Sequence, residues 1–155
     1  MTQSNVANAF LREFEAFLRC LKDTVEVASD SDWVAGEKPR NRPVHQACHC
    51  LVPLIGYTRA DIDTSRISFR FKEPEEYPAR SDILAAIADL EKAIPSYVDA
   101  VVGKTLTDKQ FAVPPLFRMI YLLRHSIVHL SYMRDELSRR GYRLPEYSKR
   151  YCPRN

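Results

Sequence analysis

Residues 114–141 read PPLFRMIYLLRHSIVHLSYMRDELSRRG, and this stretch indicates the fold more clearly than any other part of the chain. Its two prolines suit the first turn of a helix, where a missing N–H leaves no helical hydrogen bond unmade. Gly141 is typical of the residue that ends a helix. The segment 116–130 is apolar on nearly every side, as expected of the most buried helix in a bundle. We therefore predict a long buried helix over residues 114–140.

Three further segments carry apolar residues at the spacing of amphipathic helices. Each is bounded by residues that start or stop helices, namely proline, glycine or short polar side chains. These segments span residues 4–28, 43–61 and 81–103. Together with residues 114–140, they predict an all-α protein built as a four-helix bundle.

The connections between these helices differ in length and character. Residues 33–42 form a loop rich in Lys, Arg and Pro, whereas residues 64–80 predict a long irregular connection between the second and third helices. Pro53 lies inside the second helix and lacks the N–H that a helix interior requires. We expect it to bend that helix and to loosen its hydrogen bonding one turn back, near His49.

All four histidines of the chain occur as His-x3-His pairs, His45 with His49 and His125 with His129. Residues four apart on a helix share a face, so two such imidazoles can bind one metal ion at ~2.0–2.1 Å. Two pairs on packed helices can supply three or four nitrogen ligands. If three bind, a coordination position stays open for water or substrate. The spacing alone predicts a metal site drawn from His45, His49, His125 and His129.

Other side chains on the same helix faces have simpler interpretations. Cys48 lies three residues from His45 and could bind a metal, but a small buried apolar role is the commoner one. Met133 is expected in the core, and Glu136 at the surface or beside the site. Tyr121 and Tyr132 lie about one turn from the second histidine pair, where they either donate to a substrate or are buried with satisfied hydroxyls.

Composition excludes several classes of protein. The 155 residues fit one domain, residues 1–155, and 45% hydrophobic with 28% charged residues is ordinary for a globular protein. A net charge of +3 is too small for a dedicated nucleic-acid binder. No stretch resembles a secretory signal or a membrane span. We therefore expect a cytoplasmic protein with reduced cysteines and no membrane partner.

Two patches of the chain resemble the DinB/YfiT-like superfamily of metal-binding four-helix bundles. In the first, residues 44–51 read VHQACHCL, and His49 matches the family's single second-helix histidine ligand. In the second, residues 124–130 read RHSIVHL, similar to the His-x3-His of the family's last helix. In an alternative register, His129 comes first and Met133 stands where the second histidine belongs. We prefer the first register because methionine is a poor ligand for zinc or nickel.

The resemblance implies a divalent ion, zinc or nickel, held by His49, His125 and His129. His45 would then be a fourth ligand, a proton shuttle or a residue of the helix face. Similar proteins include thiol-dependent transferases and hydrolases, so a low-molecular-weight thiol is the expected small-molecule partner and a homodimer the expected assembly. The alternative is a non-catalytic bundle that binds metal or serves as a dimeric scaffold. A haem-binding bundle with opposed histidine ligands is a third hypothesis.

Overall fold

The computed structural model describes residues 3–58, 62, 64–65, 67–68, 74–103 and 114–151. These residues form six α-helices and two short 3-10 turns, at Pro39–Asn41 and Pro74–Glu76, and they contain no β-strand. The helices are α1 (Gln3–Val27), α2 (Asp30–Val34), α3 (Pro43–Thr58), α4 (Arg80–Val102), α5 (Pro115–Arg139) and α6 (Tyr147–Arg150). The chain is therefore all-helical over its described part, as the sequence predicts.

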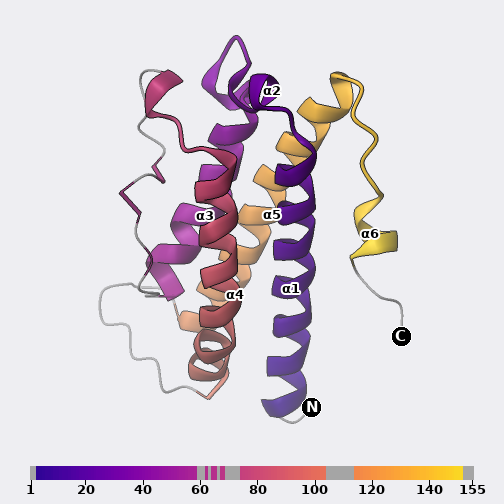
Figure 1. Cartoon of the computed structure of the whole chain (residues 1–155). Helices are drawn as coiled ribbons and strands as arrows, with labels where there is room; N and C mark the ends of the chain where they lie inside the picture. The colour runs from indigo at the N-terminus through magenta and orange to yellow at the C-terminus, as the bar shows by residue number, and fades with distance from the viewer. Residues whose placement is uncertain are drawn as a thin grey trace.

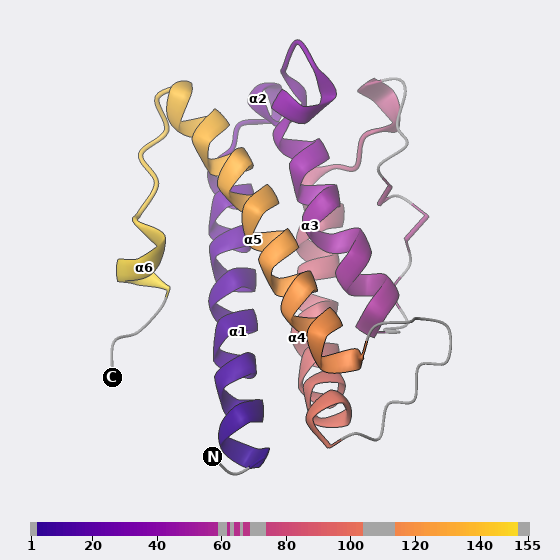
Figure 2. The same cartoon turned by 180° about the vertical axis from the view of Figure 1, so that it is seen from behind.

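Four long helices, α1, α3, α4 and α5, lie side by side (Figure 1). The closest pairs are α3 with α5 and α1 with α4, and α3 also packs on α4. Helices α1 and α5 run in one direction and α3 and α4 in the other (Figure 1). Seen from behind, α5 crosses between α1 and α3 (Figure 2). Antiparallel packing of α3 on α5 brings the two histidine pairs onto facing helices.

The predicted bounds of the four long helices agree closely with the observed ones, but the short helix α2 was not predicted. Helix α1 ends at Val27 and α5 at Arg139, each within one residue of the sequence prediction. The end predicted for the second helix, residues 59–61, lies outside the described residues, as does much of the connection 64–80. The loop predicted over 33–42 was wrong at its start, because Trp33 and Val34 belong to the short helix α2.

Helix α2 forms because its first turn is capped and its one large side chain is buried. The hydroxyl of Ser29 accepts a hydrogen bond from the backbone N–H of Asp32 at 3.1 Å, which satisfies a free donor of the first turn. Trp33 is only 3% exposed, and its indole Nε1 donates to the carbonyl of Pro78 at 2.9 Å. This contact ties α2 to the segment that leads into α4.

Arg140 fastens the loop before α3 to the end of α5. Its guanidinium donates to the backbone carbonyls of Asp32 (2.7 Å), Ala35 (2.8 Å) and Asn41 (3.0 Å), and it pairs with Glu136 at 3.0 Å. A planar guanidinium suits this role because its five donors are held in a fixed geometry. The start of α3 is thereby fixed relative to α5.

Helix α5 is less buried than the sequence predicts. Its inner face is in the core, with Met119, Leu122, Leu130 and Met133 at most 1% exposed. Its outer face, however, exposes large apolar side chains, and this corrects the expectation of a helix buried on nearly every side. They are Leu116, Phe117, Ile120, Tyr121, Val128 and Tyr132, at 40–64% exposure. No described helix is both long and apolar enough to cross a lipid bilayer.

Candidate metal centre

The four histidines lie where α3 packs against α5. His45 and His49 come from α3, and His125 and His129 from α5. Between the two helices, Ser126 Oγ donates to the carbonyl of Cys50 at 3.0 Å, and the Cys50 thiol donates to the carbonyl of Ser126 at 3.4 Å. These reciprocal bonds satisfy the buried polar groups at the point where α3 and α5 touch.

Three of the histidines converge. One ring nitrogen from each of His49, His125 and His129 lies within 4.8 Å of the other two, and all three side chains are partly buried. The His49 and His129 rings are stacked with centroids 4.5 Å apart, and the His125 and His129 rings meet edge to face at 4.5 Å. On a tetrahedral zinc ion, neighbouring nitrogen ligands stand roughly 3.3–3.4 Å apart. Three imidazole nitrogens this close together could hold a divalent ion once the rings turn toward it.

His45 occupies a different position from the other three. Its Nε2 lies 3.0 Å from Nε2 of His49, yet among the described residues it does not join the convergent group. The contact with His49 is the one expected of two residues four apart on the same helix face. The structure thus separates a group of three from a fourth histidine that touches one member of the group.

The surroundings keep these imidazoles neutral. Burial lowers the pKa of His49 and of His129 from 6.5 to about 4, and repulsion from the neighbouring histidines adds to the effect. Burial also lowers the pKa of His125, whereas an interaction with the backbone of His49 raises it in part. The pKa of His45 is lowered by burial and then by the nearby charge of Arg42. Neutral imidazole is the form that carries a lone pair for a metal.

Gln46 contacts the group and was missed by the sequence analysis. It is 3% exposed, and its side-chain oxygen lies 2.7 Å from Nδ1 of His129. Its side-chain nitrogen donates to the carbonyl of Arg40 at 2.6 Å. A polar side chain among the apolar residues at the start of α3, three residues before His49, was the signal that could have identified it.

The sulfur-containing residues near the histidines belong to the core. Cys48 and Cys50 are fully buried, and burial raises the pKa of the Cys48 thiol to about 12, so it stays protonated. Neither cysteine joins the convergent group among the described residues. Met133 is likewise fully buried, as expected of a core residue.

Two tyrosines flank the α5 histidines, but they are not buried. The Tyr121 ring stacks on His125 at 5.5 Å, and the Tyr132 ring meets His129 at 6.2 Å. They are 49% and 56% exposed, so of the two expectations the buried tyrosine with a satisfied hydroxyl is wrong. Glu136 lies at the end of α5 and pairs with Arg140.

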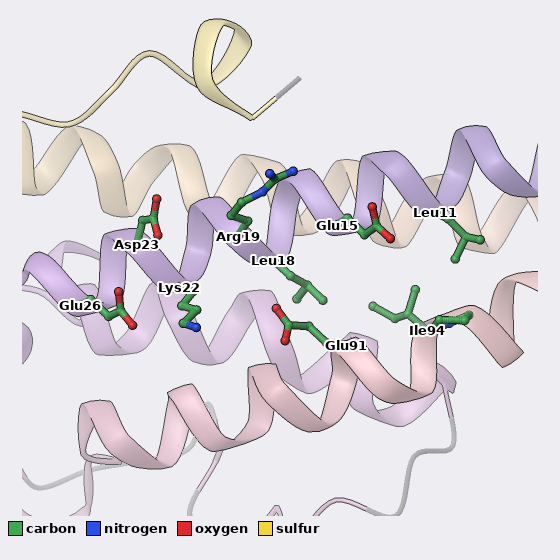
Figure 3. Close-up of a pocket in the computed structure, with 10 residues that line it drawn as sticks. Leu11, Glu15, Leu18, Arg19, Lys22, Asp23, Glu26, Glu91 and Ile94 are labelled. Carbon is green, nitrogen blue, oxygen red and sulfur yellow. The ribbon is translucent and has the colours of Figure 1, made fainter. Parts of the chain in front are cut away.

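Two cavities differ in their relation to the histidines. One of about 590 Å³ lies between α1 and α4, and its lining includes Glu15, Arg19 and Lys22 of α1 and Glu91 of α4 (Figure 3). It contains no histidine or cysteine. The other, of about 320 Å³, is polar and includes Gln46 and Tyr132, both of which contact His129. Its remaining lining residues are Arg40, Asn41, Asp135, Glu136 and Arg139.

Comparison of the chain with protein-family models, with curated proteins and with solved structures finds no match. The function of this chain is therefore inferred from the geometry of the histidine group.

The metal-free protein is expected to lose stability as the pH falls from about 6.5 toward 4. The pKa of His49 and of His129 is about 4 in the folded chain and near 6.5 when unfolded, so the unfolded chain binds more protons between these values. Stability that depends on these groups is therefore present above 6.5 and lost below it. Thermal midpoints measured in a chelator between pH 7 and pH 5 test this.

A double variant, His49→Gln with His129→Gln, is the control for this pH series, because glutamine does not titrate. Its thermal midpoint should change less over the same interval. Equal pH dependence in the variant and the unmodified protein would contradict the prediction.

Proposed function

We propose that this chain is a divalent-metal-binding protein in which His49, His125 and His129 hold one zinc or nickel ion. The main support for this proposal is the convergence of three neutral imidazoles from two packed helices. Three protein nitrogens are the ligand number of catalytic zinc sites, which keep a position for water or substrate. The four long helices, arranged as a four-helix bundle, and the His-x3-His of α5 support a DinB/YfiT-like metalloenzyme.

The reaction class we propose is thiol-dependent transfer or hydrolysis. A bound divalent ion supplies Lewis acidity that lowers the pKa of a coordinated thiol or water and so makes a nucleophile at neutral pH. The chain's own contribution is to hold the three imidazoles neutral and oriented. His45, 3.0 Å from His49, is placed to accept or deliver a proton at its Nε2. The polar cavity beside Gln46 and Tyr132 offers space for a small polar substrate.

Metal content of protein purified without a histidine tag tests this proposal. We expect about one divalent ion per chain, or uptake of one zinc ion per chain on titration after chelation. A protein that contains no divalent metal and takes up none would overturn it. Anomalous scattering at the metal edge from crystals would then identify the ion and its ligands together.

The second candidate function is a non-catalytic metal-binding or scaffold bundle. The catalytic and the non-catalytic functions differ in whether the bound ion has a coordination position open to small molecules. Cobalt-loaded protein mixed with a small thiol, such as 2-mercaptoethanol, should develop thiolate-to-cobalt absorption if that position is open. An unchanged spectrum favours the non-catalytic function.

A homodimer stays a prediction for this chain, as does a cytoplasmic location. Sedimentation velocity at several protein concentrations measures the assembly directly.

A further inference from the structure

Gln46 links the backbone of the loop before α3 to a histidine of α5. Its side-chain Nε2 lies 2.6 Å from the carbonyl oxygen of Arg40, and its Oε1 lies 2.7 Å from Nδ1 of His129. Both bonds are short, and Gln46 is 3% exposed. The amide is therefore nearly fully buried and held at both ends.

The direction of these two bonds sets the protonation pattern of the His129 ring. A backbone carbonyl only accepts, so the amide nitrogen of Gln46 must face Arg40 and the amide oxygen must face His129. An amide oxygen also only accepts, so Nδ1 of His129 must carry the ring proton. In a neutral imidazole the other nitrogen, Nε2, then has a free lone pair.

We propose that Gln46 is a positioning residue that presets the protonation pattern and orientation of His129 for metal binding. This inference rests on the proposed metal-binding function. Helix α3 thus supplies one ligand, His49, and an acceptor, Gln46, that orients a ligand of α5. Such outer partners of a metal-binding histidine fix its tautomer, and their loss typically weakens metal binding about 10–100-fold.

The first test compares Gln46→Met with Ser126→Ala. Methionine keeps the length of the side chain but accepts no comparable bond from His129. The Ser126 variant is the matched control, because it also loses a buried hydrogen bond between α3 and α5 without touching an imidazole. Zinc affinity, measured by competition with a chromophoric chelator, should fall about 10–100-fold for Gln46→Met and stay near wild type for Ser126→Ala.

Ring-nitrogen NMR of the metal-free protein provides a readout independent of metal. We expect His129 of the unmodified chain to show a protonated Nδ1 and a bare Nε2, and Gln46→Met to mix the two tautomers. An unchanged His129 pattern in Gln46→Met, or equal loss of zinc affinity in both variants, would overturn the role of Gln46.

These experiments separate the two proposals. If the unmodified chain binds no zinc, the proposed function fails. The inference that Gln46 positions a metal ligand then fails too, even if NMR finds the expected His129 tautomer. If the unmodified chain binds zinc and the variants bind it equally well, only the inference fails.

Discussion

Replacing His129 by alanine should lower the affinity for zinc by roughly 100-fold or more, whereas His45→Ala should change it little. Zinc sites with four protein ligands bind with about 10–16 kcal/mol, so one ligand contributes on the order of 3 kcal/mol, which is ~100-fold. His129 belongs to the convergent group and stacks on His49. His45 contacts His49 through its Nε2 and, among the described residues, lies outside that group. Competition titration with a chromophoric chelator measures both variants.

His45→Ala is the matched control for His129→Ala because both remove a partly buried imidazole from the same α3–α5 contact. Far-ultraviolet circular dichroism should show that both variants keep their helices. Equal loss of affinity in the two variants would mean that His45 is a fourth ligand and that the group of three is incomplete. Wild-type zinc affinity in His129→Ala would contradict the proposed site of His49, His125 and His129.

Trp33→Ala is expected to destabilise the metal-free protein by about 3–5 kcal/mol, the range for removing a large aromatic side chain from a core. Trp33 is 3% exposed and donates through Nε1 to the Pro78 carbonyl at 2.9 Å. Its loss leaves a cavity and an acceptor without its donor, between α2 and the segment before α4. Urea unfolding followed by far-ultraviolet circular dichroism measures the change in the free energy of unfolding.

Trp33→Phe separates the two contributions, because it keeps most of the aromatic packing and removes the donor. We expect it to cost about 1–3 kcal/mol, the range for leaving a buried polar group unsatisfied. A Trp33→Ala variant as stable as the unmodified protein would show that α2 does not contribute to the folded core.

The long helices were predictable because their signals are local. Apolar spacing in α4 marks Ile83, Ile87 and Leu90, and all three are fully buried. Helix α2 was missed because five residues are too few to show a helical period. Its formation depends on burying Trp33 against Pro78, which lies 45 residues away in the sequence.

The exposed outer face of α5 shows that an apolar sequence does not by itself predict how much of a helix is buried. Phe117, Ile120 and Val128 help make the segment 116–130 apolar on nearly every side, which predicts burial, yet they are 64%, 43% and 44% exposed. Hydrophobicity indicates which residues can be buried, but the number of neighbouring helices decides how many faces are covered. In this chain α1, α3 and α4 all contact α5, and its outer face lies away from them (Figure 2).

The sequence by itself determined that His45 shares a helix face with His49 and His125 with His129, because a spacing of four residues fixes this on any α-helix. Only the tertiary structure decided which of them meet. The rotation and crossing of α3 against α5 bring His49 to His125 and His129, and bring Gln46 against His129. These contacts join residues about 80 positions apart, and local periodicity carries no information about the relative rotation of two helices.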